Sequence, residues 1–510
     1  MTSVVGIDIG TTSAKAGAFD AHSDEVGHTE VAYRLLEPQP GWAVQEPDVV
    51  VDAVLAATRG ALAAARAAGV EVAGLSCSTA MHSLVALDAH DRPITPLLTW
   101  ADQRAAPQAG RLRAERPHLH ARTGTPLHPM SPLTKLVWFR EEDPDTFARA
   151  RRWCGIKELV VARLTGECVT DHSVASGTGL MNLETLDWDA EALDVAGIAA
   201  DQLPRLVDTK HIMSLTAEGA AAIGAGGGAT SVPLVVGAGD GPLANLGVGA
   251  VRPGVAACSI GTSGALRLMV ERPVVDRAGR AFCYALTPGR WVVGGAINNG
   301  GMVLQWAGDA LAPDLGDHAE KELLALAAQA PPGSDGLLML PYLLSERAPH
   351  WSTLPRGAYV GLTRAHRRPH LVRAALEGVC QQLALVLASL RDAGNAVREI
   401  RATGGFARSD LWRQILCDAL GQDVGFTEGH EGSGFGAALL GMEALGVVAS
   451  IDRSADLITM DEVYHPDPEA AAVYAAALPT FDALFEALRP AFTALRDRSR
   501  TPHPEPPSRA

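Results

Sequence analysis

The segment VVGIDIGTTSAKAGAF, Val4–Phe19, consists of two apolar runs on either side of a small polar turn. The runs Val4–Ile9 and Ala14–Phe19 have the length of strands, and the turn Gly10–Ser13 is short enough to join them as a hairpin. Asp8 lies at the end of the first run. Because an unpaired carboxylate is costly to bury, this position points to a ligand or a cation beside the turn.

A second segment repeats this pattern half a chain later. In SIGTSGALRLMV, Ile260-Gly261-Thr262 matches Ile9-Gly10-Thr11 at an offset of 251 residues, from 9 to 260. Each copy lies between two apolar runs, and repeated sequence predicts repeated structure. We therefore expect two similar domains, 1–250 and 251–450, followed by C-terminal helices and a disordered tail in 451–510.

Short apolar runs alternate with longer amphipathic segments along the chain of 510 residues, which is typical of an α/β protein. The alanine-rich segment Pro47–Ala68 predicts a helix that ends at Gly69. Leu371–Leu390 has apolar side chains at helical spacing and predicts a second helix. Val72–Ser76 and Leu84–Leu87 predict strands. A chain of this length is too long for a single core.

The composition limits the partners and the compartment. A net charge of −15 argues against a nucleic-acid binder, and any anionic ligand requires a local positive site. The seven cysteines form no CxxC pair, which favours free thiols in a reducing cytosol. The N-terminus lacks a secretory signal, and no run approaches the ~18 apolar residues of a membrane span. We therefore expect a soluble, cytoplasmic protein that binds neither nucleic acid nor membrane.

Both Gly-Thr turns present backbone N–H groups and hydroxyls in one direction, which makes a nest for phosphate oxygens. Neither turn has the GxxxxGK[ST] or GxGxxG spacing, and a single turn of this kind is more often an ordinary hairpin. The presence of two copies favours a ligand held from both domains. Asp8 would repel a phosphate unless a cation lies between them, and Mg²⁺ is the usual bridge to a nucleotide.

Two further segments place functional side chains after predicted strands. In ATGGFARSDLW, Ala402–Trp412, Gly404 and Gly405 allow a flat ring to approach the backbone, although a plain strand-to-helix turn explains the pattern equally well. In VVGAGDGPLANLG, Val235–Gly247, Asp240 lies between glycines after an apolar run. On the residues alone, Asp-Gly is more often a turn than part of a catalytic site.

Several longer motifs, in order along the chain, resemble the FGGY family of carbohydrate kinases. They are AMHSLVALD at Ala80, TWADQR at Thr99, GTPLHPMSPLTKLVW at Gly124, GIKELVVARLTGE at Gly155, TLDWD at Thr185 and WVVGGAINNGGMVLQW at Trp291. The resemblance extends from Val4 to about Gly446. It implies a pair of actin-like, ribonuclease-H-like domains that flank a catalytic cleft. Within the family, the motifs are most similar to those of members that phosphorylate gluconate.

The resemblance implies an ATP site shared by the two domains. Asp8 would help to hold the Mg²⁺ of Mg-ATP. The residues implied along the phosphates are Thr11, Thr12, Ser13 and Lys15 of the first domain and Gly261 and Thr262 of the second. The residues implied beside the nucleotide are Gly301 and Gln305, with Gly404, Gly405 and Ser409 at the adenosine.

The resemblance also implies the catalytic base and the acceptor pocket. Asp240 would take the proton of a sugar hydroxyl as that hydroxyl attacks the γ-phosphate, and it would lie beside the metal with Asp8. The residues implied in the sugar pocket are Met81, His82, Trp100 as an apolar wall, and Asp102 as a hydroxyl acceptor. Because the two substrates are held by different domains, we expect the domains to close around them.

The implied acceptor is D-gluconate, phosphorylated at the hydroxyl far from its carboxylate, and xylulose is the runner-up. A buried substrate carboxylate needs a cation, and three lie in the gluconate-like motifs without one being preferred: Arg104, Lys135 and Lys157. Two rival functional classes are a non-catalytic sugar-binding regulator and an actin-like ATPase. The chain departs from the family pattern at Leu344-Ser345-Glu346-Arg347 and at Gly434, which bears on nucleotide geometry.

Overall fold

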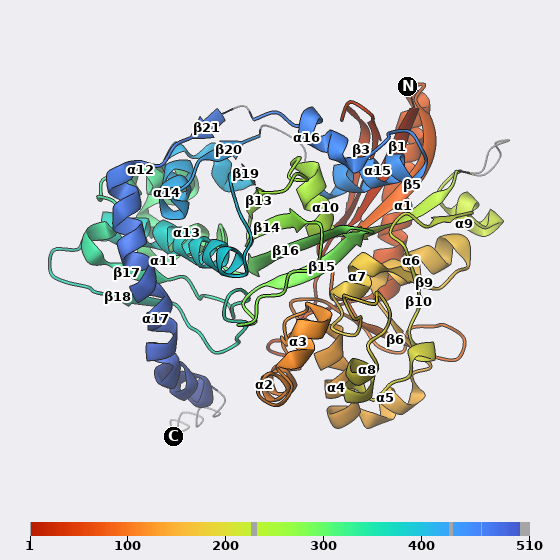
Figure 1. The fold of residues 1–510 in the computed structure, drawn as a ribbon, viewed down its shortest axis with the longest axis horizontal. Helices are drawn as coiled ribbons and strands as arrows, with labels where there is room; N and C mark the ends of the chain where they lie inside the picture. The colour runs from red at the N-terminus through yellow and green to blue at the C-terminus, as the bar shows by residue number, and fades with distance from the viewer. Residues whose placement is uncertain (1, 226–231, 428–431, 461, 500–510) are drawn as a thin grey trace, which may run out of the picture.

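The computed structural model contains two large β-sheets whose strands follow the same order and directions (Figure 1). The structure describes residues 2–225, 232–427, 432–460 and 462–499. The first sheet has the order β11 (Ile212–Met213), β12 (Leu234–Gly239), β5 (Glu71–Thr79), β1 (Thr2–Ile9), β2 (Ser13–Asp20) and β3 (Glu25–Ala32). The second has the order β15 (Phe282–Thr287), β16 (Arg290–Ile297), β14 (Gly264–Val270), β13 (Val255–Ile260), β19 (Glu399–Thr403), β20 (Val424–Phe426) and β21 (Glu462–Tyr464).

The strands of the two sheets correspond one to one, apart from the additional edge strand β15. In each sheet an antiparallel meander is followed by two parallel strands and a final antiparallel edge strand. The two predicted hairpins are the pairs β1–β2 and β13–β14, with Asp8 opposite Lys15 and Ser259 opposite Ala265. The repeat in the sequence is therefore confirmed as a repeat of structure.

Alternation along β1 sends neighbouring side chains to opposite faces of the first sheet. Val5, Ile7 and Ile9 pack in one core with helix α1 (Pro47–Ala67), whereas Val4 belongs to a core on the other face. Asp8 shares this second face with Val4. It therefore points away from α1 and toward the side on which the second domain lies.

Helix α15 (Gly432–Ala444) covers this second face and packs against β1 and β5. A Cβ atom on Gly6 would come within 2.1 Å of the Gly434 carbonyl oxygen, so the helix and the strand meet backbone to backbone. A Cβ atom on Gly434 itself would meet no described atom within 4 Å. The departure from the family pattern at Gly434 therefore changes no packing.

Helices cover both sheets. Two of them, α1 and α13 (Arg368–Asp392), are the helices that the sequence predicts. The other helices from residue 240 onward, besides α15, are α10 (Asp240–Gly247), α11 (Met302–Leu311), α12 (Ala319–Ala327), α14 (Asp410–Leu420), α16 (Ser454–Leu457) and α17 (Pro468–Ser499). By length and composition alone, α13 and α17 are apolar enough to cross a membrane. The most apolar window of α13 is 89% buried inside the protein, as in a core helix, and that of α17 is 17% buried. Helix α17 packs on the body through Phe481, Phe485 and Phe492.

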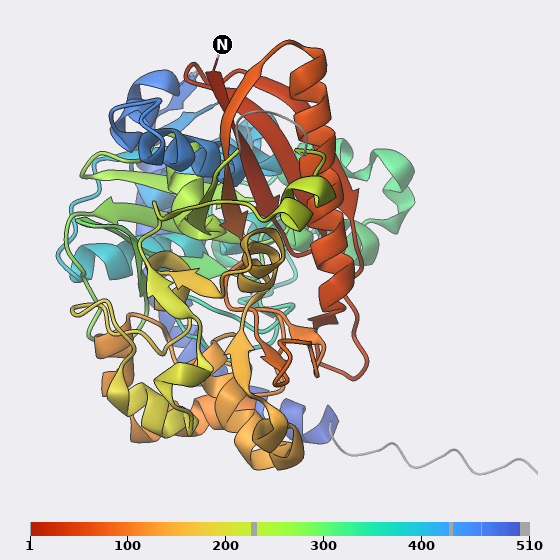
Figure 2. The same cartoon turned by 90° about the vertical axis from the view of Figure 1, so that its right-hand side faces the viewer.

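A layer of shorter helices lies below the first sheet (Figures 1 and 2). Its helices are α2 (Ala106–Glu115), α3 (His118–Thr123), α4 (Pro132–Glu142), α5 (Pro144–Arg149), α6 (Ile156–Thr165), α7 (His172–Ser176) and α8 (Ala190–Ala196), whereas α9 (Ala217–Ala222) lies higher, beside the sheet (Figure 1). Short paired strands accompany them and the second domain: β4 (Val44–Gln45) with β7 (Leu97–Leu98), β6 (Val85–Leu87) with β8 (Arg152–Cys154), β9 (Val169–Asp171) with β10 (Arg205–Val207), and β17 (Leu338–Leu340) with β18 (Ala358–Val360).

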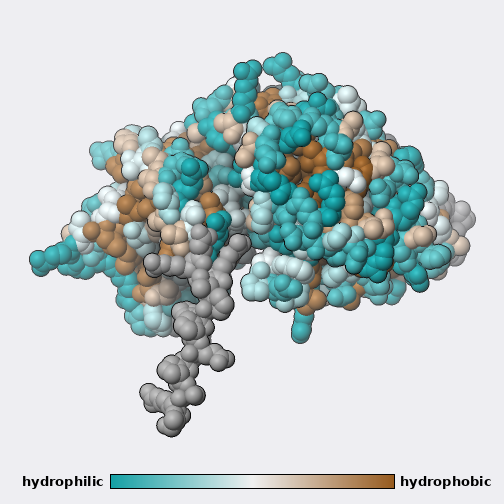
Figure 3. Space-filling view, turned by 90° about the horizontal axis from the view of Figure 1, so that it is seen from below, coloured by the Kyte–Doolittle hydropathy of each residue, from teal (hydrophilic) through white to brown (hydrophobic). Residues whose placement is uncertain are grey.

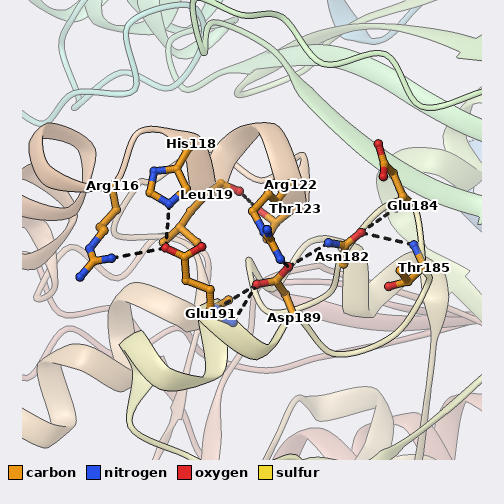
Figure 4. A network of polar contacts seen from close by, with 11 residues as sticks. Arg116, His118, Leu119, Arg122, Thr123, Asn182, Glu184, Thr185, Asp189 and Glu191 are labelled. Carbon is orange, nitrogen blue, oxygen red and sulfur yellow. Dashed lines mark hydrogen bonds and ion pairs between the residues drawn. The ribbon is translucent and has the colours of Figure 1, made fainter.

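A polar network fixes α3 against α8 (Figure 4). Asp189 caps α8, and one of its oxygens accepts from Arg122 at 2.7 Å and from Asn182 at 2.9 Å. Helix α3 ends at Gly124, whose carbonyl accepts from the backbone N–H of Cys283 in β15 at 2.9 Å. The network therefore orders α3 within the helical layer, and the backbone hydrogen bond of Gly124 joins this layer to the second domain.

Seen from below, the surface is largely hydrophilic with smaller apolar patches (Figure 3). The tail predicted to be disordered, residues 501–510, lies outside the described residues. The predicted domain limits near residues 250 and 450, and the cytoplasmic location, stay predictions.

Candidate active site

A cavity of about 260 Å³ lies between the two halves of the chain. Its lining residues are Thr11, Met81, His82, Trp100, Met130, Asp240 and Gly241 from the first half, and Ser259, Ser263, Gly264, Arg267, Phe282, Tyr284, Ala296, Arg347 and Trp351 from the second. Five predicted site residues meet here: Thr11, Met81, His82, Trp100 and Asp240. We call this space the acceptor cavity.

Asp240 is the carboxylate of the acceptor cavity. It follows β12 as the first residue of α10, and its Oδ1 accepts a hydrogen bond from the Gly241 N–H at 2.7 Å. Loss of bulk water and the negative charge of Asp8 raise the pKa of Asp240 to about 6, against the opposing effect of Arg267. At neutral pH the group is therefore ionised, yet it is more basic than an ordinary aspartate.

Helix α7 positions the backbone that carries Asp240. The N–H of Gly239 donates to the Ser173 hydroxyl oxygen at 3.2 Å, and Ser173 lies in the first turn of α7. Asp171 caps α7 through the N–H groups of Ser173 and Val174 at 2.9 and 3.0 Å. The ammonium of Lys157 pairs with Asp171, and both side chains are almost fully buried. This buried pair thus stabilises the strand end from which the base projects.

His82 is held as a neutral imidazole at the edge of the acceptor cavity. Its Nδ1 lies 2.7 Å from the Gly177 carbonyl oxygen, to which it donates, and desolvation lowers its pKa to about 3. Its Nε2 then carries a lone pair and lies 3.4 Å from the Tyr284 hydroxyl of the second domain. The residue has a positive φ of 69°, which turns the ring out of the end of β5. His82 can therefore accept, but not donate, at the cavity.

Trp100 forms a wall of the acceptor cavity between two polar contacts. Its indole Nε1 donates to the Thr11 hydroxyl oxygen at 2.9 Å. The Arg347 guanidinium lies over its ring, 4.7 Å from the centroid. The predicted apolar wall thus links the first hairpin turn to a cation of the second domain.

The prediction that Asp102 accepts a substrate hydroxyl stays a prediction, and the structure gives both oxygens of this side chain partners inside the protein. Its side chain is fully buried outside the acceptor cavity. Oδ1 binds the Arg104 guanidinium at 2.8 Å, and Oδ2 accepts from the Ala43 N–H at 2.9 Å. Both oxygens therefore serve the packing of the TWADQR segment, because a buried carboxylate must find partners inside the protein.

The suggestion that Arg104, Lys135 or Lys157 meets a substrate carboxylate also stays a prediction, and none of the three lines the acceptor cavity. Arg104 pairs with Asp102 and lies 3.6 Å from the centroid of the Trp42 ring. Lys135 donates to the carbonyl oxygens of His82 and Thr99 at 2.7 and 2.8 Å, and burial lowers its pKa to about 7. Each cation has a structural partner, as Lys157 has in Asp171.

The cations that do line the acceptor cavity are Arg267 and Arg347, which the sequence interpretation missed. Desolvation lowers the pKa of both groups, to about 10 for Arg347, where the charge of Arg267 adds to the effect. A signal was present for Arg267, because it is the single charge in the otherwise apolar run ALRLMV. A lone arginine in an apolar strand is a candidate for an enclosed functional charge.

A second cavity, of about 380 Å³, lies beside the second hairpin. Its lining residues are Ile260, Gly261, Gly301, Leu304, Gln305, Gly308, Asp309, Glu320, Leu323, Gly405, Phe406, Arg408 and Trp412. Four of the predicted nucleotide residues are therefore here: Gly261, Gly301, Gln305 and Gly405. We call this space the nucleotide cavity.

Three predicted nucleotide residues lie next to this cavity without lining it. Gly404 has a φ of 120°, and a Cβ atom there would be 2.2 Å from the Ile260 carbonyl oxygen, so only glycine fits. Ser409 caps α14 and accepts from the Trp412 N–H at 3.3 Å. The Thr262 carbonyl accepts from the Gly300 N–H at 3.1 Å, which ties the hairpin turn to the Gly300-Gly301 turn.

The first hairpin places its predicted residues differently. Asp8 and Lys15 line a third cavity, of about 220 Å³, with Ser433 and Gly434 of α15. Asp8 Oδ1 accepts from the Ser78 hydroxyl at 2.7 Å. The Thr12 carbonyl accepts from the Tyr33 N–H at 2.9 Å, and the Ser13 carbonyl from the Gly10 N–H at 3.0 Å. The turn is thus closed by its own backbone and tied to Tyr33, the residue that follows β3.

The second hairpin turn separates the acceptor cavity from the nucleotide cavity. Gly261 lines the nucleotide cavity, whereas Ser263 and Gly264 line the acceptor cavity. A ligand that extends over this turn would therefore bring its end to the cavity that holds Asp240. This geometry suits the transfer of a terminal group from one ligand to another.

Two protein-family models match consecutive parts of this chain. The models for the N-terminal and C-terminal domains of the FGGY family of carbohydrate kinases match residues 3–247 and 256–445. The chain is also 41% identical over 512 residues to the Gluconokinase of Bacillus subtilis (strain 168), a match that covers 98% of this chain and 99% of that protein.

Two solved structures from Lactobacillus acidophilus share the fold. The gluconate kinase has a TM-score of 0.91 at 33% identity and covers 97% of this chain and 99% of its own. The ligand-bound xylulose kinase has a TM-score of 0.91 at 33% identity and covers 97% of this chain and 100% of its own. Overall shape therefore does not distinguish between these two acceptors.

Proposed function

This chain belongs to the FGGY family of carbohydrate kinases, and from that premise we propose that it transfers the γ-phosphate of ATP to D-gluconate, forming 6-phosphogluconate. Its fold is the two-domain, actin-like α/β fold of that family. The observation that carries the choice of acceptor is the charge of the acceptor cavity. One carboxylate, Asp240, faces two guanidiniums, those of Arg267 and Arg347.

The acceptor cavity carries an excess of positive charge although the chain has a net charge of −15. His82 is neutral there, so its only charged side chains are the three just named. Before ATP binds, a neutral ketose would leave the two enclosed guanidiniums with Asp240 as their one anion, whereas an aldonate supplies a second. Sequence similarity to a gluconokinase at 41% identity supports the same choice.

Asp240 acts as the general base in this proposal. Its Oδ1 is held by the Gly241 N–H, and we assign Oδ2 to the acceptor hydroxyl. The hydroxyl proton passes to Oδ2 while the hydroxyl oxygen bonds to the γ-phosphorus and the bond to the β-phosphate oxygen breaks, which releases ADP. A carboxylate with a pKa of about 6 is ionised at neutral pH and is still basic enough to take the proton.

The residues of the first hairpin fit Mg²⁺ that arrives with the nucleotide. In the described part of the chain no three His, Cys, Asp or Glu side chains form a metal cluster. Mg²⁺ commonly binds through one or two carboxylates, substrate phosphates and water, so Asp8, with Asp240 nearby, is sufficient. When bound, the ion would neutralise the charge that develops on the phosphates.

The nucleotide cavity would hold ATP. Phe406 and Trp412 offer apolar surface to the adenine, and Gly261 and Thr262 offer backbone groups to the phosphates. In the first domain Thr11, Thr12, Ser13 and Lys15 remain the residues proposed along the phosphates. We assign the acceptor to residues 1–250, the nucleotide to 251–450 and a supporting role to the helices after 450. The protein then acts on a small sugar acid and ATP.

An acceptor panel tests the proposal. ADP release is measured with gluconate, xylulose, ribulose, fuculose and glycerol, and gluconate should give the highest kcat/KM. Asp240→Asn should lower kcat by several orders of magnitude, whereas Asp194→Asn, on the exposed side of α8, serves as the matched control. If xylulose is preferred by a wide margin, the acceptor is a ketose; if ATP is consumed equally without any sugar, the protein is an ATPase.

A further inference from the structure

Arg267 lines the acceptor cavity without a protein partner for its guanidinium. It lies on β14, opposite Ala257 of β13 on one side and Gly294 of β16 on the other. Among the described residues no hydrogen bond or direct ion pair to its side chain is present, and Asp240 reaches it only through space. A guanidinium has five N–H donors, so one that lines a cavity without a hydrogen-bond partner in the described residues is free to bind the acceptor oxygens of a ligand.

The protein leaves room for this side chain. A Cβ atom on Gly294 of the neighbouring strand β16 would lie 2.4 Å from the Leu266 carbonyl oxygen, 2.9 Å from the Arg267 Cα and 3.2 Å from its Cγ, so the backbone of β14 leaves no room for a side chain there. A Cβ atom on Gly241 would lie 3.5 Å from the Arg267 Nε, which is ordinary contact. With glycine at both positions, the Arg267 side chain lies in the acceptor cavity beside the turn that carries Asp240.

Arg347, the other cation of the acceptor cavity, is already committed to the protein. One of its terminal nitrogens donates to the Ile297 carbonyl oxygen at 3.1 Å, and its plane lies over Trp100. Its Nε is buried without a hydrogen-bond partner in the described residues. The guanidinium N–H groups of Arg267 have no partner in the described residues, so this side chain can bind a carboxylate through two parallel hydrogen bonds.

Arg267 lies at the end of the cavity away from the phosphate turn. Strand β14 begins at Gly264, directly after that turn, and three residues of strand carry the backbone roughly 10 Å from it before Arg267 is reached. The pKa of Asp240 responds to the charges of Asp8 and Arg267, whereas the ionised group that acts on the pKa of Arg267 is Asp240. This supports a spatial order in which Asp240 lies between Asp8 and Arg267.

We propose that Arg267 binds the carboxylate of the sugar acid and is the residue that selects an acid over a neutral sugar. This rests on the proposed function. An extended aldonate spans roughly 6 Å from its carboxyl carbon to its terminal hydroxymethyl carbon. With the terminal hydroxyl at Asp240, the carboxylate reaches toward the Arg267 fork. The alternative role, contact with the γ-phosphate, requires the side chain to turn back toward Gly264.

The test compares D-gluconate with D-gluconamide, a neutral analogue that differs only at the carboxyl group. The variants are Arg267→Met, which removes the charge, Arg267→Lys, which keeps it, and Arg272→Met as the control for a lost cation in the exposed segment after β14. For each, kcat and KM are measured with both acceptors at saturating ATP. Gluconate binding without ATP is measured by calorimetry, and thermal unfolding reports folding.

Wild-type protein should prefer gluconate over gluconamide by about a hundredfold or more in kcat/KM, and Arg267→Met should reduce that ratio to within about tenfold, mainly through the KM for gluconate. Arg267→Lys should retain an intermediate ratio, and Arg272→Met should retain that of the wild type. Calorimetry should show gluconate binding lost in the methionine variant of Arg267 alone.

Two results would overturn the inference. An equal loss of kcat with both acceptors in Arg267→Met would assign the residue to the phosphate, and an unchanged ratio in that variant would assign the selection to another group. Both leave the wild-type preference for gluconate, and with it the proposed function, intact. A wild-type protein that prefers xylulose would overturn the proposed function and this inference together.

Discussion

Replacing Asp240 by asparagine should stabilise the folded protein while it abolishes turnover. Desolvation and Asp8 raise the pKa of Asp240 from 3.8 to about 6, so the folded state disfavours the ionised form that catalysis needs. Since one pKa unit corresponds to ~1.36 kcal/mol, this difference amounts to about 3 kcal/mol. The side chain faces the acceptor cavity, where solvent screens its charge, and the expected gain is roughly 1–3 kcal/mol.

The gain should depend on pH in a defined direction. Below pH 3.8 the carboxyl group is protonated in both states, so aspartate and asparagine are equivalent in charge. Between pH 3.8 and about 6 only the unfolded chain ionises, and the wild-type protein loses stability as the pH rises. Above about pH 6 the group is ionised in both states, and the advantage of asparagine reaches its full value.

Thermal unfolding of the two proteins checks this reasoning. Near neutral pH the Tm of Asp240→Asn should exceed that of the wild type by roughly 2–8 °C, and the difference should shrink near pH ~5. Asp194→Asn should show no such pH-dependent difference, because its side chain is exposed. If the variant is no more stable than the wild type at neutral pH, or if its gain in stability is independent of pH, the folded state does not disfavour the ionised form of Asp240 and the reasoning is refuted.

Four other outcomes are expected. With gluconate, kcat/KM should fall about tenfold per pH unit below about pH 6, because Asp240 must be ionised to accept a proton, and a flat profile would remove it as the base. Lys157→Met should lower the free energy of unfolding in urea by about 3–5 kcal/mol because it leaves Asp171 buried and unpaired; a change below about 1 kcal/mol would contradict this. Asp102→Asn should lower the Tm because Arg104 loses its charged partner, and the KM for gluconate should not rise. A raised KM at unchanged Tm would show that Asp102 contacts the substrate. Small-angle scattering should show a smaller radius of gyration with gluconate and a nonhydrolysable nucleotide, whereas an unchanged profile would argue against domain closure.

Local sequence was sufficient for the elements that carry the site. The hairpins at Asp8 and Ser259 follow from apolar runs on either side of a short turn, and their pairing in two matching sheets follows from the repeat. Helices α1 and α13 followed from their apolar periodicity, to within three residues at each end. Asp240 needed more than its local pattern, because an Asp-Gly pair after a strand is ambiguous until a family resemblance is added.

The partners of the charged side chains could not be predicted in this way. Arg104, Lys135 and Lys157 lie in motifs of the first domain, yet each finds its partner within that domain and turns away from the cavity. Arg267 and Arg347 reach the cavity from the second domain, where no motif marked them as substrate contacts. The same charge is structural or functional according to which segments meet it across the fold.

The amino-acid sequence by itself determined the two hairpins, their repetition, the α/β alternation and the place of the base at a strand end, because strand period, turn chemistry and helix period act over a few residues. Only the tertiary structure decided which cations face the acceptor. Whether a guanidinium is held by the protein or left for a ligand depends on which segments meet it across the fold: Arg347 contacts Ile297 and Trp100, whereas Arg267 lies beside Gly241 without a hydrogen-bond partner in the described residues.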